Sequence, residues 1–164
     1  MAHNRHFGHK YSHFGEDGHG QEVAFFSNTE GRSIKWNPDT AALSGQRFTV
    51  TYPQVAAGDV AKTFFIAPAS CKVISAYERH VTVAGQAGTL TIEKLESGDA
   101  PGSGDAVLAE AFDLTSTANI PVTKAAVTTA AATLAAGDAL CLKLASGAAT
   151  SYALGTITVT MEWI

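Results

Sequence analysis

The sequence predicts an all-β protein, an antiparallel β-sandwich that carries a long irregular N-terminal arm. Two observations support this fold class. From Arg47 onward, short runs rich in Thr, Val and Ala alternate apolar and polar residues with a period of two. Residues 1–46 hold five of the six histidines and six of the fourteen aromatic residues, in an order without a period. We therefore expect an extended N-terminal arm, residues 1–46, and a β-sandwich domain, residues 47–164.

Eight strands are expected in the domain, separated by clusters of Gly, Pro, Ser and Asp. They are residues 47–52, 62–67, 71–83, 89–95, 106–112, 122–129, 139–145 and 156–164. The clearest pattern is that of the last strand, whose apolar face consists of Ile157, Val159, Met161 and Trp163. Because side chains alternate between the two faces of a strand, we expect this face to lie in the core or in a subunit interface.

Glycines interrupt the arm too often for a helix, yet the arm is richer in aromatic residues than a disordered tail usually is. Aromatic rings gain much from burial, so we expect them to bind the arm to a larger partner or to a neighbouring subunit. The expected binding residues are Phe7, Tyr11, Phe14, Phe25, Phe26 and Trp36. The run Asn37-Pro38-Asp39-Thr40 is typical of a turn or of the start of a short helical turn through Leu43.

The arm histidines do not predict a metal site. His6, His9 and His13 are three and four residues apart, but a helix is not expected there and no cysteine completes a zinc-binding spacing. We expect these side chains to be solvated or to lie in an interface. Asp99 and Asp105 flank the loop 97–105, but they lack the alternating ligands of a calcium loop. The sequence therefore predicts no metal and no cofactor.

Catalytic motifs are also missing from the sequence pattern. No nucleophile elbow, phosphate-binding loop or Ser-His-Asp set is evident, so we do not expect an enzyme. The domain's single histidine, His80, follows Glu78-Arg79 in a predicted strand, and we expect it at the surface or in an interface. Cys71 and Cys141 lie in predicted strands as buried free thiols, with a disulfide between them as the alternative if those strands face each other.

The charge pattern argues against nucleic acid and membrane partners. The net charge of −4 is spread evenly, and neither part of the chain contains the basic stripe that binds phosphates. No apolar stretch reaches the length of about 18 residues that a membrane helix needs. The polar start of the chain does not resemble a signal peptide, so we expect synthesis in a cytoplasm.

About 100 residues from Phe64 onward carry an ordered set of short phrases. They are Phe65-Ile66-Ala67-Pro68, Cys71-Lys72-Val73, Gly85-Gln86-Ala87-Gly88-Thr89, Ile92-Glu93-Lys94, Ala100-Pro101-Gly102-Ser103-Gly104, Phe112-Asp113-Leu114-Thr115-Ser116-Thr117-Ala118-Asn119 and Leu134-Ala135-Ala136-Gly137-Asp138. In these phrases the chain resembles the capsid decoration (cement) and head-fibre proteins of tailed bacteriophages. The resemblance implies a sandwich of jelly-roll type and a homotrimer. It also implies a position on the outside of the head, bound to the major capsid protein. The arm contains none of these phrases.

From these observations the sequence predicts a structural virion protein that binds the capsid exterior and stabilises it. The alternative is a carbohydrate- or receptor-binding β-sandwich module of a phage fibre. Sugar sites usually expose aromatic rings on loops, but the loops 97–105 and 146–151 contain no aromatic residue. Tyr152, just after the second loop, is the best candidate for such a contact.

Overall fold

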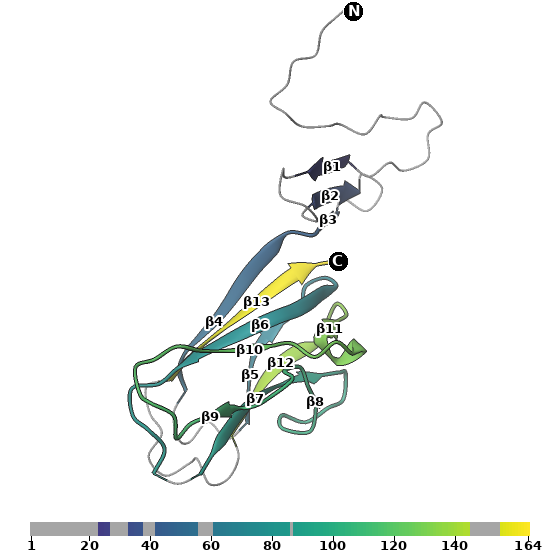
Figure 1. Cartoon of the computed structure of the whole chain (residues 1–164). Coiled ribbons are helices and arrows are strands. Elements are labelled where there is room, and N and C mark those ends of the chain that lie inside the picture. The colour runs from purple at the N-terminus through teal and green to yellow at the C-terminus, as the bar shows by residue number, and fades with distance from the viewer. Residues whose placement is uncertain (1–22, 27–32, 38–41, 56–60, 86, 145–154) are drawn as a thin grey trace, which may run out of the picture. The chain divides into compact units, whose positions relative to one another are not determined.

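The computed structural model describes residues 23–26, 33–37, 42–55, 61–85, 87–144 and 155–164, and all structural statements refer to these residues. The chain divides into two units. One consists of Met1–Arg47 together with Glu162–Ile164, and the other is Phe48–Met161. The second unit contains the sandwich, which is shown with its strand labels in Figure 1.

Two antiparallel sheets form the sandwich. One has the strand order β10-β6-β13-β4, with β11 also paired to β6, and the other has the order β5-β12-β7-β8, with β9 also paired to β7. The strands are β4 (Arg47–Val55), β5 (Ala61–Ile66), β6 (Cys71–Arg79), β7 (Thr89–Leu95), β8 (Asp105–Ala106), β9 (Phe112–Asp113), β10 (Val122–Ala125), β11 (Thr133–Leu134), β12 (Ala139–Leu144) and β13 (Gly155–Trp163).

The strand order is that of a jelly roll. Strand β4 lies beside β13, β5 beside β12, β6 beside β10, and β7 beside β8 and β9. These pairs are nested, as in one long hairpin that folds over and contributes strands to two sheets in turn. The predicted β-sandwich of jelly-roll type is thereby confirmed.

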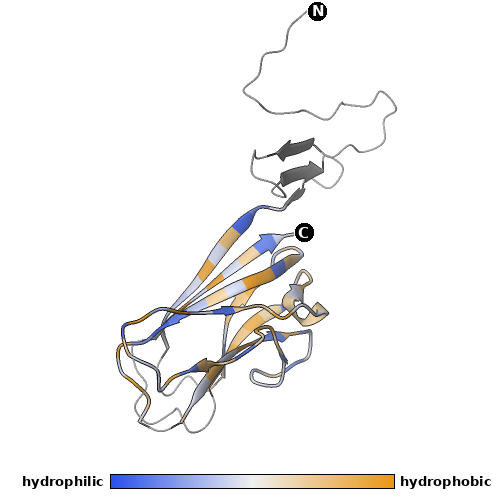
Figure 2. Ribbon diagram, viewed as in Figure 1, coloured by the Kyte–Doolittle hydropathy of each residue, from blue (hydrophilic) through white to orange (hydrophobic). Residues whose placement is uncertain are grey.

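The last strand supplies much of the inner face of its sheet. Ile157, Val159 and Met161 are fully buried, whereas the threonines between them are partly exposed. Trp163 is half-buried at the end of the strand. The predicted register is confirmed, since a slip of one residue would exchange the two faces. Figure 2 shows the alternation of hydropathy along the strands. Further large side chains in the core are Leu90, Ile92, Phe112, Leu114, Leu134, Leu140 and Leu142.

Aromatic contacts join the edge strands β4 and β5. The rings of Phe48 and Phe65 lie 6.2 Å apart between centroids, and those of Tyr52 and Phe64 lie 5.9 Å apart. Consecutive residues of a regular strand point to opposite faces. The register of β5 against β12 shifts at this point, and such a bulge allows both phenylalanines to contact β4.

Three predicted strands differ from the structure. The predicted strand 122–129 ends as β10 at Ala125. The predicted strand 106–112 is split into β8 and β9, because its middle part leaves β7 and turns to the other sheet. There the Ala109 N–H donates to the Ala125 carbonyl at 3.0 Å, and Leu108 forms a bridge to Ala126. The predicted strand 71–83 ends as β6 at Arg79. A short 3-10 helix, Ala130–Ala132, was not predicted.

The other unit contains a small antiparallel sheet with the order β1-β2-β3. Its strands are β1 (Val23–Phe26), β2 (Ser33–Asn37) and β3 (Ala42–Ser44). Asn37 lies opposite Ala42, so the predicted turn signal falls between two strands, and Ala42–Ser44 is strand rather than a helical turn. This sheet was not predicted from the sequence of the arm.

Met161 provides a test of the register of β13. Met161→Ala removes a fully buried side chain and is expected to lower the free energy of unfolding by about 2–5 kcal/mol. The matched variant Thr160→Ala alters the outer face and should cost about 1 kcal/mol or less. Urea denaturation of both variants measures the difference, and equal losses would contradict this register.

Candidate functional site

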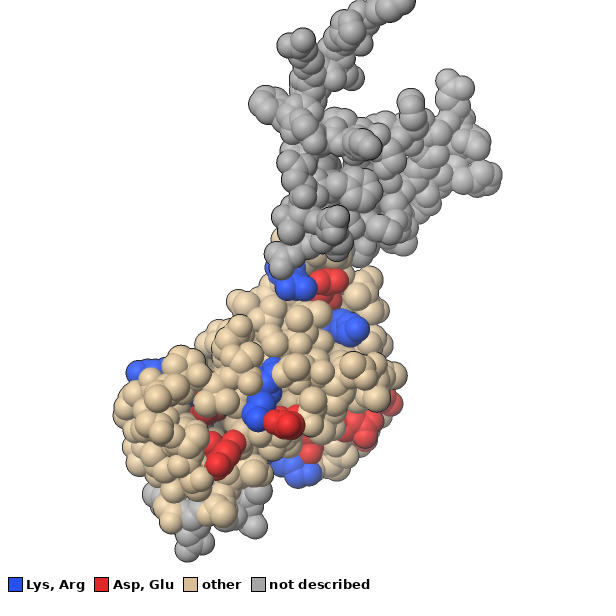
Figure 3. Space-filling view, viewed as in Figure 1, with Lys and Arg blue, Asp and Glu red and all other residues tan. Residues whose placement is uncertain are grey.

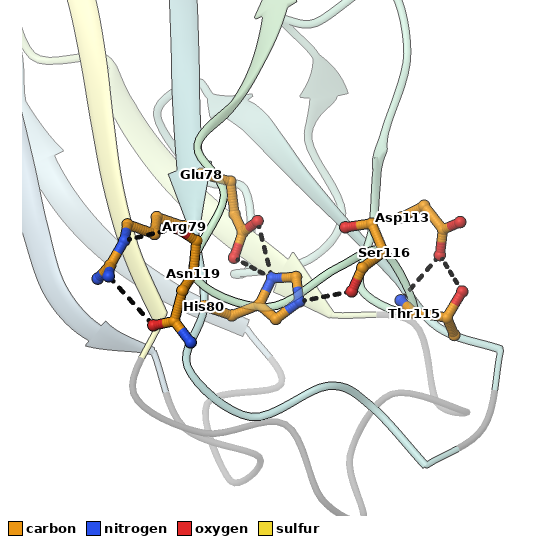
Figure 4. Close-up of polar contacts among 7 residues, drawn as sticks. All are labelled: Glu78, Arg79, His80, Asp113, Thr115, Ser116 and Asn119. Atoms are coloured by element: carbon orange, nitrogen blue, oxygen red, sulfur yellow. Dashed lines mark hydrogen bonds and ion pairs between the residues drawn. The ribbon is translucent and has the colours of Figure 1, made fainter.

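Seven polar residues meet where β6 ends and the segment after β9 turns back (Figure 4). We call this group the tip cluster. Its members are Glu78, Arg79, His80, Asp113, Thr115, Ser116 and Asn119. Strand β6 brings the first two residues, and the segment that begins at the end of β9 brings the last four.

The alternation along β6 explains why two of these polar side chains lie inside the protein. Ala76 and Glu78 point inward, the intervening Tyr77 and the following Arg79 point outward, and His80 continues the inward series. Glu78 and His80 have no exposed area. The prediction that His80 lies at the surface or in an interface is therefore wrong, because the strand's register carries it into the interior.

His80 connects β6 to the loop after β9. Its Nδ1 lies 3.0 Å from Oε1 and 3.1 Å from Oε2 of Glu78, and its Nε2 lies 3.1 Å from the main-chain carbonyl oxygen of Ser116. A buried carboxylate is costly unless it is paired and hydrogen-bonded, and His80 supplies that partner.

Further hydrogen bonds fix the loop itself. The Thr115 N–H and hydroxyl both donate to Asp113 Oδ1, at 2.9 and 2.7 Å. These bonds, with a smaller contribution from the charges of His80 and Lys124, hold the pKa of Asp113 below its usual range. The loop therefore begins with a turn fixed by its own side chains.

Asn119 closes the loop against the end of β6. Its N–H donates to the His80 carbonyl at 2.7 Å, while Arg79 donates to the Asn119 carbonyl at 3.3 Å and to Oδ1 at 3.1 Å. Asn119 has a φ of 66°, in the left-handed region where asparagine is among the better tolerated residues. The segment is thus bound to β6 at both His80 and Arg79.

The cluster contains a serine, a histidine and a carboxylate, but their geometry does not serve nucleophilic catalysis. His80 Nε2 faces the main-chain oxygen of Ser116 and not its hydroxyl. The Ser116 Oγ is buried without a hydrogen-bond partner among the described residues, and Glu78 and His80 are closed to solvent. The arrangement instead joins a loop to a strand.

A second polar contact lies on the other sheet. Glu93 accepts hydrogen bonds from Lys143 Nζ at 2.8 Å and from the Gly104 N–H at 3.2 Å, so the loop 97–105 folds back onto β7. A Cβ at position 104 would meet the Lys94 main chain and would lie 2.8 Å from Leu95 Cδ2, so glycine permits this close approach. Glu93 is buried as a result.

The two aspartates of this loop do not form a cation site in the structure. Asp99 Oδ2 accepts the Glu96 N–H at 2.8 Å, which closes a turn. Within the described ranges, no group of three or more His, Cys, Asp or Glu side chains is arranged to hold a metal ion. The arm histidines lie outside those ranges.

Cys71 and Cys141 are buried free thiols, as predicted. Burial, with a smaller contribution from the charge of Asp138, raises the pKa of Cys71 to about 11. Burial also raises the pKa of Cys141, whose Sγ donates to the Leu142 carbonyl at 3.1 Å. Neither environment activates a thiolate.

The structure describes only part of the predicted capsid-binding set. Phe25 and Phe26 lie in β1 and Trp36 lies in β2, opposite Val23 and Leu43. Phe7, Tyr11 and Phe14 fall outside the described residues, as does Tyr152. Capsid binding through these rings stays a prediction.

Charged side chains are scattered over the face shown in Figure 3, and no basic stripe crosses that face. Several form pairs of opposite sign, such as Lys124 with Glu110 at 2.7 Å and Arg47 with Glu162 at 3.2 Å. Among the described residues, no helix has the length and apolar character to cross a membrane.

No protein-family model and no curated protein matches the chain. Solved structures of infectious bursal disease virus show a weak similarity. A chain of the Gx strain structure is 17% identical over 86% of this chain and 42% of its own length, with a TM-score of 0.32. A chain of the VP2 subviral particle is 18% identical over 85% of this chain and 42% of its own length, with a TM-score of 0.35. A chain of the T13 viral particle is 17% identical over 78% of this chain and 37% of its own length, with a TM-score of 0.34.

This chain thus spans less than half of the length of those viral chains. At such TM-scores the similarity supplies no argument about function.

The two thiols are expected to be unreactive in the folded protein. With a pKa of about 11, Cys71 is only about one part in a thousand thiolate at pH 8, and burial restricts access to both cysteines. Ellman's reagent at pH 8 should label neither residue within minutes, whereas in 6 M guanidinium chloride it should label both. Rapid labelling of either cysteine in the native protein would contradict the buried placement.

Proposed function

We propose that this protein is a structural component of a bacteriophage virion that binds the outside of the capsid and stabilises it. The proposal rests on the resemblance of the stretch from Phe64 onward to capsid decoration and head-fibre proteins. The observation that carries it is spatial, because phrases that are separate in the sequence meet in the fold.

The phrase Phe65–Pro68 meets the phrase Leu134–Asp138 through two main-chain hydrogen bonds. The Ala67 N–H donates to the Asp138 carbonyl and the Gly137 N–H donates to the Ala67 carbonyl, both at 2.8 Å. These bonds join the end of β5 to the turn before β12. The two phrases therefore form one contact that connects β5 to β12.

Two further pairs of phrases meet in the same way. The Leu114 N–H donates to the Gly88 carbonyl at 3.1 Å, which joins the phrases at 85–89 and 112–119. The Gly104 N–H donates to Glu93, which joins the phrases at 100–104 and 92–94. The matching phrases thus contact one another at three places that connect strands of the sandwich. This placement supports a jelly-roll fold shared with the decoration and head-fibre proteins. The structural role is inferred from the resemblance to those proteins.

A rigid sandwich suits a protein that adds contact area across a capsid and carries out no reaction. The tip cluster and the Glu93 contact use buried polar groups to fix loops. We infer that attachment uses the aromatic residues of the arm, since each buried ring contributes about 1.5–3 kcal/mol. Ordering the chain costs about 1–2 kcal/mol per residue, so burial of these rings can offset the ordering of short segments around them but not of the whole arm.

A receptor- or sugar-binding module of a phage fibre is the second candidate, and Tyr77 is the observation that favours it. This ring is 43% exposed on β6, opposite Thr123 of β10. Binding of the purified protein to a glycan array or to host cells, with loss on Tyr77→Ala, would favour the fibre module. Binding to heads that lack the protein would favour the decoration role.

Removal of the arm tests how the protein attaches. A variant that begins at Gln46 should fold as a β-domain, because Gln46 retains its carbonyl for the Trp163 N–H, although the bond from the Gly45 N–H is lost. We expect it to lose at least tenfold in affinity for heads that lack the protein, measured by co-sedimentation. Circular dichroism controls for folding.

The matched full-length variant carries Phe7→Ala, Tyr11→Ala and Phe14→Ala and leaves the described strands unchanged. It should lose affinity in the same direction. If both variants bind heads as tightly as the full chain, the attachment surface lies on the sandwich and not on the arm.

We further expect a homotrimer, which follows from the resemblance. The sandwich exposes large apolar side chains that suit subunit contacts, among them Ile66 at 64% and Ile120 at 53% exposure. Analytical ultracentrifugation at micromolar concentration should give a species of three times the 17.0 kDa chain mass. A single species at the chain mass, with no symmetric contact on the particle, would contradict the trimer.

A further inference from the structure

We propose that Glu78 and His80 form a proton-dependent latch, which holds the loop from Asp113 to Asn119 against the end of β6 only while both ring nitrogens of His80 carry a proton. This inference rests on the geometry of the tip cluster and is independent of the proposed virion role.

The hydrogen-bond partners of the two ring nitrogens indicate how many protons the ring carries. Nδ1 lies at nearly equal distances, 3.0 and 3.1 Å, from the two oxygens of Glu78, which is the geometry of one N–H shared between the oxygens of an ionised carboxylate. Nε2 faces the Ser116 carbonyl at 3.1 Å, and a carbonyl oxygen can only accept. With Glu78 ionised, both nitrogens must donate, and a neutral imidazole has only one N–H to donate.

Charged groups near His80 come from three strands. The Glu78 carboxylate belongs to β6 and the Asp113 carboxylate to β9, and the charge of Asp113 interacts with that of His80. The cations nearby are Arg79, which is hydrogen-bonded to Asn119, and Lys124 of β10, which forms an ion pair with Glu110. Of these groups, the Glu78 carboxylate lies within hydrogen-bond distance of the ring, as does the Ser116 carbonyl.

The latch holds the loop at two points. His80 contacts the loop through its ring at Ser116 and through its carbonyl at the Asn119 N–H. Val81 follows His80 in the chain and Ile120 follows Asn119. Their side chains are 40% and 53% exposed. Release of the ring from Ser116 would free the segment that positions these apolar side chains.

The direction of the pH effect follows from the proton count. When His80 loses one proton, a ring nitrogen with a lone pair must face either Glu78 or the Ser116 carbonyl, and that buried contact becomes repulsive. The latched loop binds one more proton than the open loop does, so a rise in pH favours opening. We expect the latch to be closed while this proton is bound and to open as the pH rises and His80 loses it.

The experiment uses the full chain labelled with ¹⁵N. Long-range ¹H–¹⁵N spectra recorded from pH 5.5 to 9.5 report whether each ring nitrogen of His80 carries a proton. Hydrogen exchange of the Thr115 and Asn119 amides, corrected for intrinsic pH dependence, reports loop opening. Across the deprotonation of His80, the opening equilibrium of these amides should rise on the order of tenfold, whereas amides of β12 should not change.

Glu78→Gln is the discriminating variant. Its side-chain amide can donate to Nδ1, so a neutral imidazole satisfies both partners, with Nε2–H donating to Ser116. The variant should show one protonated ring nitrogen at pH 7.5 and a loop whose exchange does not follow pH. Asp113→Asn is the matched control for a neighbouring charge. Because Asp113 itself accepts the Thr115 N–H, this control is measured at the Asn119 amide, which should keep the pH dependence.

Two results would overturn the latch. One is a wild-type His80 with a single protonated nitrogen at pH 6 and a protected loop. The other is loop exchange that remains independent of pH while the ring loses its proton. Both readouts come from the wild-type protein, so the test stands even if Glu78→Gln fails to fold.

Discussion

Side chains alternate between the interior and the surface along each long strand of the sandwich, whatever their chemistry. In β13 this alternation buries Ile157, Val159 and Met161 without conflict, because every inward residue is apolar. In β6 the same rule carries Glu78 and His80 into the interior, where they must find partners. The tip cluster is the consequence, since a loop from the other sheet has to provide the carbonyl that the strand cannot.

Local patterns were sufficient to predict the positions of the long strands. Strands β4, β7, β12 and β13 lie close to their predicted ranges, because a period of two is visible within six residues. The break between β8 and β9 could not be predicted in this way, since it depends on contacts of Leu108 and Ala109 with the other sheet. The small sheet of the arm was missed because its strands have three to five residues.

The tip cluster shows where prediction of a site from this sequence fails. Ala76, Glu78 and His80 alternate in one series, and continuing the inward face of β6 would have placed the histidine in the interior. The identity of its second partner was beyond such an argument, because Ser116 is 36 residues away and contributes a main-chain atom. Of the predicted capsid-binding residues, Phe25, Phe26 and Trp36 lie in described strands, and sequence pattern alone does not assign a partner to any of them.

The pairing of the first domain strand with the last has a consequence for synthesis of the protein. Thr51 and Thr158, whose hydroxyls lie 3.0 Å apart, are 107 residues apart in the sequence. At about 5–20 residues per second a ribosome needs on the order of ten seconds to make the chain between them, and β4 has no partner during that time. Folding of the sandwich must therefore wait until β13 has been made, and its distant pairings make it slow, on the order of milliseconds to seconds. Until β13 arrives, the open edge of β4 is exposed to other nascent chains, which makes this interval the step most vulnerable to aggregation.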